Sequence, residues 1–320
     1  MKTLRLLRVA LFALAPALGA AQEFPSKPVR IVVPFTAGSA TDILARTVGQ
    51  RLNEMWNQSV VIDNRPGAGG TIAAGAVAKS APDGTTLMVH SSGHAANAFI
   101  YTALPYDTLK DFVQVVPLAG QPNVLVTSAA SGYKTVADLI ADAKKRPGAV
   151  NFGSAGIGSG THFNAEKFKL AAGIDVIHVP YKGTPEAMTD TIAGRVSYFF
   201  SPISAALPQV RDGKLVALAV SSAKRSSLLP NVPTVAESGL PGFDYNLWVG
   251  VFAPAGTPND VVDKINRSVN RVLGEADVQA RMAALGAEPM AMNPAEFDRF
   301  MRAEMDDAAK VVKAAGIKAQ

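Results

Sequence analysis

Two glycine- and serine-rich segments hold the residues best suited to chemistry in this chain, and that chemistry is the binding of an anion. Residues 34–40 follow an apolar run at 29–33 and precede a helical pattern, and residues 153–162 repeat that order. A loop between a strand and a helix presents free backbone N–H groups and the positive end of the helix dipole, which bind anions without a charged side chain. Facing each other across a cleft, the two loops would hold a small acid. Alternatively, both are ordinary connections whose glycines only permit tight turns.

Catalytic motifs in the same segments are incomplete. The nucleophile elbow G-x-S-x-G requires serine where Gly158 stands, and the dinucleotide-binding pattern requires glycine where Thr161 stands. No Walker A sequence occurs, and the S-x-x-K sequence at 221–224 lacks the S-D-N and K-T-G elements that accompany it in a catalytic site. The enzymatic alternative that stays open is an exported hydrolase with Ser154 or Ser159 as its nucleophile.

Metal and cofactor sites find little support in the sequence. The chain has no cysteine, which excludes thiolate zinc sites and iron–sulfur clusters. His90 and His94 are four residues apart, but Gly93 between them speaks against a shared helical face, and no H-E-x-x-H sequence occurs. His162 and Glu166 have the spacing of one helix face, which suits a polar helix contact as well as catalysis. We therefore expect no cofactor and no bound metal.

The elements that must position these loops alternate between strand and helix patterns, which predicts an α/β fold with mainly parallel strands. Apolar runs at 29–33, 60–62, 86–89 and 124–126 predict buried strands. Residues 296–313 have the spacing of a helix that packs on the core. Helix starts are indicated by capping-box spacing or by an early proline: Ser39 with Asp42, Thr135 with Asp138, Thr184 with Pro185, Thr257 with Pro258, and Asn293 with Pro294 and Glu296.

The length and the first residues predict an exported protein of two domains. The chain has 320 residues, more than one compact core usually holds. Residues 1–21 have the basic start, the short apolar run and the small residues of a secretory signal peptide, so we expect cleavage near Ala21. Three of the 31 basic residues lie in that segment, which leaves 28 against 26 acidic residues. This balance argues against a nucleic-acid partner, and no later run is long and apolar enough to insert into a membrane.

Six segments, in order along essentially the whole mature chain, resemble the Bordetella uptake gene family, the solute receptors of tripartite tricarboxylate transporters. The combination is specific, although each segment alone is not. The segments are P-F-T-A-G-S-A-T-D-I-L-A-R at 34–46, V-I-D-N-R-P-G-A-G-G at 61–70, L-P-Y-D with K-D-F at 104–112, the glycine-rich segment at 153–162, V-P-Y-K-G at 179–183, and P-N-V-P-T-V-A-E at 230–237.

The resemblance implies a two-lobed periplasmic-binding-protein fold of the second type, with the ligand between the lobes. Lobe one would comprise residues 22–122 and 243–320, and lobe two residues 123–242. The family implies a monomeric, non-catalytic periplasmic receptor that binds a small organic acid and serves the membrane subunits of a transporter. A periplasmic sensor that binds the same ligand but signals to a partner is an alternative.

The resemblance also implies the residues of the site, where main-chain amides, hydroxyls and ordered waters hold a carboxylate. From lobe one these are Phe35, Thr36, Ala37, Gly38 and Ser39, with Asp42 behind them and Ser92 and His94 as a second wall. From lobe two they are Ser154, Gly156 and Ser159, with Tyr181, Phe200 and Ser201 closing the pocket. Asp42 could equally cap its own helix, and the aromatic rings could simply pack the lobes.

The nature of the ligand depends on residues that differ from the family pattern. Relatives often have a second glycine where this chain has Ser39, and many carry an acidic residue near Ser201. Without that acid, an ammonium group would lack a partner, which argues against an amino acid as ligand. Phe35, Tyr181, Phe200 and Trp248 favour a flat or apolar acid, such as an aromatic carboxylate. If these rings only pack the lobes, a short dicarboxylate bound through water is the alternative.

Overall fold

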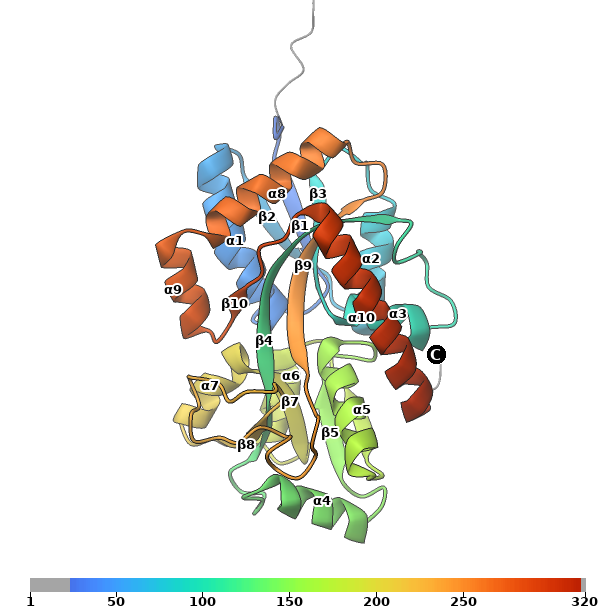
Figure 1. The fold of residues 1–320 in the computed structure, drawn as a ribbon, viewed down its shortest axis with the longest axis vertical. Helices are drawn as coiled ribbons and strands as arrows, with labels where there is room; N and C mark the ends of the chain where they lie inside the picture. The colour runs from blue at the N-terminus through green and yellow to red at the C-terminus, as the bar shows by residue number, and fades with distance from the viewer. Residues whose placement is uncertain (1–23, 318–320) are drawn as a thin grey trace, which may run out of the picture.

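The computed structural model describes residues 24–317, and the predicted signal peptide lies outside this range. Two α/β lobes are stacked along the long axis of the molecule (Figure 1). One of them, called lobe one, contains the described part of the chain before residue 120 and most of the part after residue 246; the other is called lobe two. The α/β class and the two-lobed architecture predicted from the sequence are therefore confirmed.

Lobe one is built on the sheet order β2-β1-β3-β9-β4. Strands β1 (Val29–Val33), β2 (Val60–Asn64) and β3 (Thr86–Ser91) are parallel, whereas β9 (Asn246–Pro254) is antiparallel to β3 and to β4 (Phe112–Ser128). The short β10 (Glu288–Pro289) pairs with β4. Successive strand residues face opposite sides, so Ile31 packs under α1 (Ala40–Trp56), α8 (Asn259–Leu273) and α9 (Ala276–Ala284). Its neighbour Val32 faces α2 (Thr71–Ala78) and α10 (Pro294–Ala315) on the other side.

Lobe two continues β4 into a second group of strands. The end of β4 is antiparallel to β7 (Tyr198–Pro202) and β8 (Leu215–Val220), and β5 (Asn151–Ser154) lies parallel between β7 and β6 (Ile177–Pro180). Phe200 faces α4 (Val136–Lys145) and α5 (Gly160–Ala172), while its neighbour Phe199 faces α6 (Thr184–Ile192) and α7 (Ile203–Arg211). The lobe therefore has one sheet with helices on both sides.

The lobes are connected by β4 and by the segment before β9. Gly120 pairs with Trp248 in lobe one, whereas Val124 pairs with Ser201 in lobe two, so β4 crosses at residues 121–123. The chain returns at Tyr245, whose N–H donates to the carbonyl of Ser221 at 2.8 Å. The boundaries expected at residues 122 and 243 stay a prediction.

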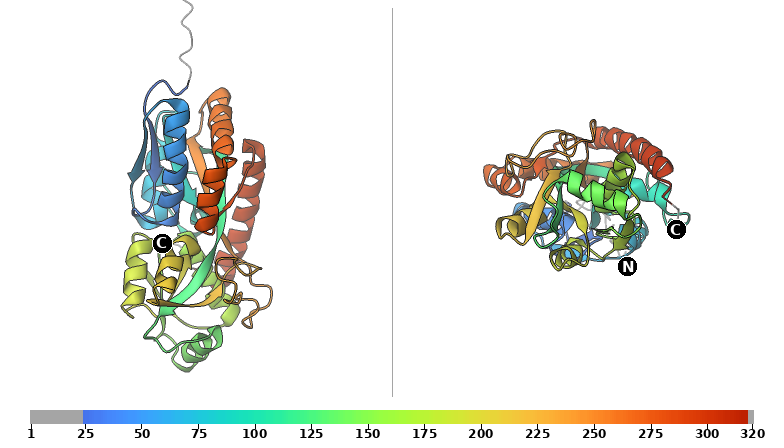
Figure 2. Two further views of the ribbon diagram at one scale, coloured as in Figure 1. Left: turned by 90° about the vertical axis from the view of Figure 1, so that its left-hand side faces the viewer. Right: turned by 90° about the horizontal axis from the view of Figure 1, so that it is seen from below.

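Helix α10 contacts both lobes. Phe297 and Met301, near its start, are fully buried in lobe one. Ala308 and Val312, near its end, belong to the same hydrophobic core as Phe163 of α5 in lobe two. Figure 2 shows the helix running along one side of both lobes. Within residues 24–317, no helix combines the length and the apolar character that a membrane crossing requires.

Most of the helices expected from the sequence begin where the local capping signals predict. Thr135 and Asn293 make full capping boxes with Asp138 and Glu296. The capping box expected at Ser39 is wrong, because the Ser39 hydroxyl makes no bond within its own helix. It accepts instead from the backbone N–H of Thr184 in lobe two, at 3.3 Å. The reason is tertiary: the first turn of α1 lies where the other lobe supplies a donor.

Candidate functional site

The positive ends of six helices point toward the boundary between the lobes. Strands β1, β2 and β3 of lobe one lead into α1, into the short helix η1 (Ala68–Gly70) with α2, and into α3 (Gly93–Ile100). In lobe two, β5, β6 and β7 lead into α5, α6 and α7. Ligands of open α/β sheets bind outside the carboxyl ends of such strands, where the first helical turns leave N–H groups unpaired. Neither of the two glycine- and serine-rich loops contains lysine or arginine. The boundary therefore has the dipoles and hydroxyl groups that suit an anion.

The lobes are closed on each other at the loop after β1. The hydroxyl of Thr36 donates to Glu186 Oε2 of α6 at 3.0 Å. Ser39 accepts from Thr184, as described above, and a Cβ placed on Gly183 would lie 1.9 Å from the Thr36 hydroxyl. Thr36 and Ser39, both expected in the site, thus face the other lobe. The exposed Ala37 and Gly38 form the outer part of the same loop.

A second closure contact lies on the loop after β5. The Tyr101 hydroxyl of lobe one donates to the carbonyl of Ile157 at 2.8 Å. Close backbone approach is possible because glycine stands on the lobe-one side. A Cβ on Gly69 would lie 1.8 Å from that carbonyl oxygen, and a Cβ on Gly93 would lie 2.4 Å from the oxygen of Gly158. No other residue type fits there without separating the lobes.

Asp42 organises the loop of lobe one from behind. It accepts from the N–H of Gly38 at 2.9 Å, from the Arg46 guanidinium and from Asn64. Burial alone would raise the pKa of Asp42, but the bonds from Arg46, Gly38 and Asn64 outweigh it and lower the pKa below 3.8. The ionised carboxylate is therefore already partnered within lobe one, by the backbone of the loop and by the Arg46 and Asn64 side chains. Phe35 is also buried, and its ring meets the His90 ring edge-on at 5.6 Å.

Ser92 and His94 were expected to form a second wall of the site in lobe one, but they do not lie together there. His94 is fully buried, and its ring lies 5.0 Å from that of Phe112 and 4.8 Å from that of Phe252. Burial keeps its pKa well below 6.5, so the ring is neutral. The structure places His94 in the hydrophobic core because its ring turns into an aromatic cluster. Ser92 stays at the boundary, where its hydroxyl bonds that of Tyr245 at 2.8 Å, and Tyr245 also donates to the Gly160 carbonyl.

In lobe two, the amides of the glycine-rich loop turn inward. Ser159 caps α5 by accepting from the N–H of His162 at 3.2 Å. The expected donor Gly156 could reach a ligand only by giving up its present bond, so the donors left to a ligand here are the first two N–H groups of α5, at Gly160 and Thr161. The inward bonds run from Ala155 N to Thr161 Oγ1 (2.9 Å), from Gly156 N to Ser154 Oγ (3.0 Å) and from Gly158 N to His162 Nδ1 (3.2 Å).

The aromatic lining expected in lobe two is not assembled. Phe200 is fully buried, with its ring 5.3 Å from that of Phe168, because β7 is a central strand covered by α5. The hydroxyl of the half-buried Tyr181 donates to Asp190 at 2.7 Å, within the same lobe. Ser201 is fully buried, and its hydroxyl donates to the carbonyl of Pro202. The structure thus places Phe200 in the core of lobe two, and Tyr181 and Ser201 in contacts within that lobe.

Sequence reasoning missed the residues that join the lobes. Thr184 was recognised as a helix start but not as the partner of Ser39, and Glu186, Tyr101 and Tyr245 gave no signal at all. Several buried polar atoms on elements that meet at the boundary have no partner among the described residues, among them Thr41 Oγ1, Gln121 Nε2 and Ser204 Oγ. Such atoms are normally satisfied, so a ligand or water is expected to reach them.

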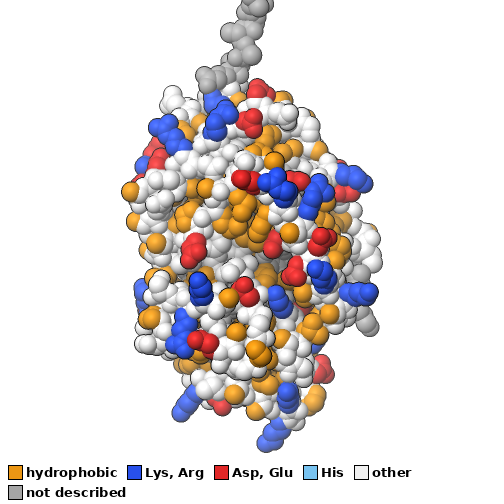
Figure 3. Space-filling model, viewed as in Figure 1, with side chains coloured by type: hydrophobic (Ala, Val, Ile, Leu, Met, Phe, Trp, Pro, Cys, Tyr) orange, Lys and Arg blue, Asp and Glu red, His pale blue; other side chains and the backbone are white. Residues whose placement is uncertain are grey.

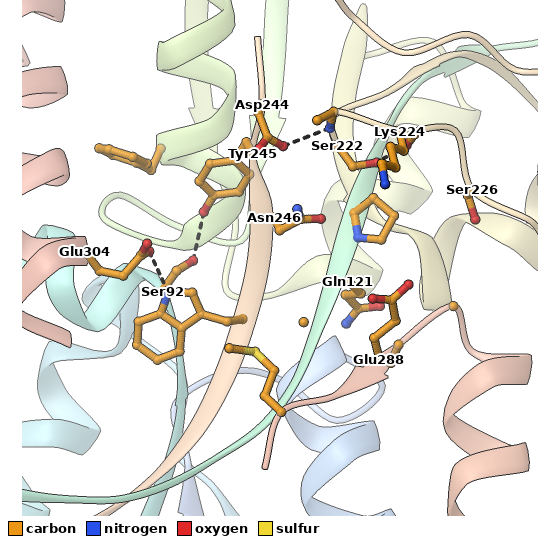
Figure 4. A pocket seen from close by; sticks show the side chains of 18 of the residues that line it. Ser92, Gln121, Ser222, Lys224, Ser226, Asp244, Tyr245, Asn246, Glu288 and Glu304 are labelled. Carbon is orange, nitrogen blue, oxygen red and sulfur yellow. Dashed lines mark hydrogen bonds between the residues drawn. The ribbon is translucent and has the colours of Figure 1, made fainter. Parts of the chain in front are cut away.

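A large cavity lies on the hinge side of the molecule, apart from the two glycine- and serine-rich loops. It has a volume of about 1300 Å³ and is lined by both lobes and by the crossing segments (Figure 4). Glu288, Glu304 and Asp307 line it on the side of lobe one, and Lys167, Lys224 and Arg225 line it on the side of lobe two. Trp248, a candidate for ligand selectivity, lies here, with its Nε1 donating to Glu304 at 2.7 Å. Burial raises the pKa of Glu304 above 4.5, despite that bond.

The fold and the closed boundary define the class of protein: a two-lobed solute-binding protein with the ligand site between the lobes. Residues 44–317 match the model of the tripartite tricarboxylate transporter family receptor. The chain belongs to this family, as the sequence resemblance predicted.

Several similar proteins cover nearly the whole chain. BugT of Bordetella pertussis is 38% identical over 300 residues, which span 93% of this chain and 92% of BugT. The R. palustris protein Rpa4515, solved with adipate, is 38% identical with a TM-score of 0.90, covering 93% of this chain and 100% of that one. MatC of Rhodopseudomonas palustris, solved with bound malate, is 34% identical with a TM-score of 0.86, covering 90% and 100%. The family and these neighbours are solute-binding receptors rather than enzymes, which contradicts the alternative of a serine hydrolase.

Proposed function

We propose that this protein captures a small organic dicarboxylate between its lobes in the periplasm and delivers it to the membrane subunits of a tripartite transporter. The observation that carries the proposal is the convergence of helix N-termini from both lobes on one closed boundary. Only the closed form brings donors of both lobes to the ligand, so binding and closure stabilise each other. A secreted monomer, with its signal peptide removed near Ala21, fits this role.

An aliphatic dicarboxylate suits the site better than an aromatic acid. Of the four rings considered as lining, Phe200 lies in the core, Tyr181 bonds Asp190, and Trp248 faces the hinge side. Phe35 alone remains beside the loops. A ligand with an acidic group at each end would use the donors of both lobes, and the adipate and malate complexes of relatives support this choice.

A ligand panel tests the proposal. Calorimetry and thermal unfolding would compare adipate, malate, benzoate, aspartate and the monomethyl ester of adipate. A ligand at 100 times its dissociation constant should stabilise the protein by about 2.7 kcal/mol. Esterifying one carboxylate should weaken binding by about 2–4 kcal/mol, because charge-assisted hydrogen bonds are lost. A monoester that binds as tightly as the diacid, or a response to benzoate or aspartate alone, would refute the assignment.

The transport role needs a cellular test. Deleting the gene should abolish uptake of the ligand that the panel identifies, and restoring the gene should recover it. Normal uptake together with a lost transcriptional response to that ligand would favour the sensor alternative.

On the face shown in Figure 3, acidic and basic side chains are interspersed over both lobes, which does not resemble a nucleic-acid footprint.

A further inference from the structure

We propose that His162 and His178 are positioning residues of the ligand site: as neutral imidazoles they hold the loop at 155–158 against lobe one, and closure on a ligand releases the protons that they bind in the open form. The loop-holding part stands on the geometry of lobe two alone. The proton release rests on the proposed function, because it requires a ligand that closes the lobes.

His178 fixes the start of the loop through Ser154. Its Nε2 lies 2.6 Å from the Ser154 hydroxyl, which also accepts from the N–H of Gly156. Strand register explains the pairing: Phe152 lies opposite His178 on the neighbouring strand, and Ser154, two residues on, shares its face. The His178 ring stacks on that of Phe152 at 4.8 Å, which holds the imidazole in place.

His162 fixes the end of the loop. Its Nδ1 accepts from the N–H of Gly158 at 3.2 Å, so Nδ1 must be unprotonated and Nε2 must carry the hydrogen. An imidazolium has no acceptor, and protonation of His162 would set two N–H groups against each other. The rings of His162 and His178 are stacked at 4.2 Å, so a charge on one ring disfavours a charge on the other.

The segment held in this way carries the closure contacts. Ile157 accepts from Tyr101, and the backbone of Gly158 lies against Gly93 of lobe one. A loop that lost its two imidazole bonds would no longer present these groups together. The histidines therefore act on the ligand through the loop, not by touching the ligand.

The surroundings of the two rings disfavour a positive charge in the closed form. Burial comes first and lowers the pKa of His162 to about 3 and that of His178 to about 4. The charged neighbours among the described residues are Glu166, with Oε1 3.7 Å from His162 Nε2, and Lys169, 4.0 Å from Glu166. Lys169 opposes a further positive charge, and burial raises the pKa of Glu166, which weakens its pull on the proton. Tyr198 packs beside Phe152 on the neighbouring strand.

Opening the lobes should hydrate these rings. A cavity of about 220 Å³ beside them is lined by Ile157 and by the end of α10, at residues 315–317. That helix starts in the core of lobe one, although Ala308 and Val312 near its end pack with Phe163 of lobe two, and Ile157 is bonded to Tyr101 of lobe one. Separation of the lobes would break the Tyr101 bond and so release the Ile157 wall of this cavity, and in the more hydrated open form we expect the imidazoles to move toward the ordinary pKa of about 6.5.

The difference in imidazole pKa between the open and the closed form decides whether closure releases or takes up protons. At pH 6, an imidazole with a pKa of about 6.5 holds about 0.8 proton, and one with a pKa of about 4 holds about 0.01. Closure on a ligand therefore releases protons, up to about 0.8 per histidine. The release should vanish above about pH 8, where both forms are neutral.

The experiment is calorimetry with adipate at pH 6 in two buffers of different ionisation enthalpy. Wild-type protein should release a measurable fraction of a proton. The double variant His162→Asn and His178→Gln keeps a polar atom near each bonded nitrogen but cannot titrate, so it should bind with little release. His162→Leu, which removes the acceptor, should bind about tenfold more weakly or worse. As a matched control, His94→Gln changes an imidazole buried in lobe one and should leave the release unchanged.

Each outcome is decisive. Equal proton release by the wild type and the double variant, with both binding adipate, would overturn the inference and leave the proposed function intact. If no acid of the panel binds, the proposed function fails, and nitrogen NMR of the ligand-free protein still tests the loop. An Nδ1-protonated His162, or unchanged exchange protection of the Gly158 amide in His162→Leu, would overturn the inference there.

Discussion

A methyl group at Gly69 should hold the lobes apart. Its Cβ would lie 1.8 Å from the carbonyl oxygen of Ile157 and 2.9 Å from the carbonyl carbon, both backbone atoms that cannot turn away. Relief requires a shift of more than about 1 Å to reach an ordinary contact. Such a shift would break or weaken the 2.8 Å bond from Tyr101 to the same carbonyl. Gly69→Ala should therefore destabilise the closed form specifically.

The free-energy cost of Gly69→Ala has two parts, backbone strain and weakened closure, which a matched control separates. Gly69 has a φ of +59°, so alanine there costs about 1–2 kcal/mol of backbone strain whether the lobes are open or closed. Gly173, at the end of α5, has the same φ of +59°, and nothing lies within 4 Å of its Cβ position. Gly173→Ala thus carries the strain without the clash. The closure part, a strained or lost interlobe hydrogen bond at a buried contact, is about 1–3 kcal/mol, or roughly 5- to 150-fold in affinity.

The assays are calorimetry with adipate and small-angle scattering with and without it. Both variants should lose similar stability toward urea in the absence of ligand. Only Gly69→Ala should bind weakly and fail to become more compact on adding adipate. Equal affinities for the two variants would refute the closed boundary as the ligand-binding state.

Three further perturbations test other parts of the site. Ser39→Ala removes the acceptor of the Thr184 amide, so adipate should bind about three- to tenfold more weakly, while the free energy of unfolding stays nearly unchanged. Unchanged affinity for adipate would contradict the interlobe bond. Asp42→Asn should cost about 1–3 kcal/mol of stability in urea at pH 7. Because the pKa of Asp42 is lowered in the folded protein, that contribution is present above about pH 4 and lost as the pH falls below it, so the two proteins should converge in acid. A constant difference down to pH 3 would speak against an ionised Asp42. Phe200→Ala should lower the free energy of unfolding by about 3–5 kcal/mol through the cavity it leaves in the core, without changing the order of ligand preference. Altered selectivity at near-normal stability would show that Phe200 lines the ligand pocket.

Local sequence determined the elements and the family of this protein. Strand positions follow from apolar runs that need only a buried sheet, and the caps at Thr135 and Asn293 use partners three residues away. Such interactions depend on backbone geometry that neighbours in the chain already share. The six family segments likewise indicated two lobes and a ligand between them, before any contact was known.

Tertiary structure alone decided what the side chains of the site bond to. The Ser39 hydroxyl does not cap its own helix because Thr184, 145 residues away, offers an amide in the closed form. Likewise, His94 lies in the core because the turn into α3 points its ring at Phe112 and Phe252, and no periodicity announces that direction. The amides of Gly156 and Gly158 face inward because Ser154 and His162 accept from them. A sequence pattern shows that a donor exists, whereas its direction depends on which acceptor the fold brings within about 3 Å.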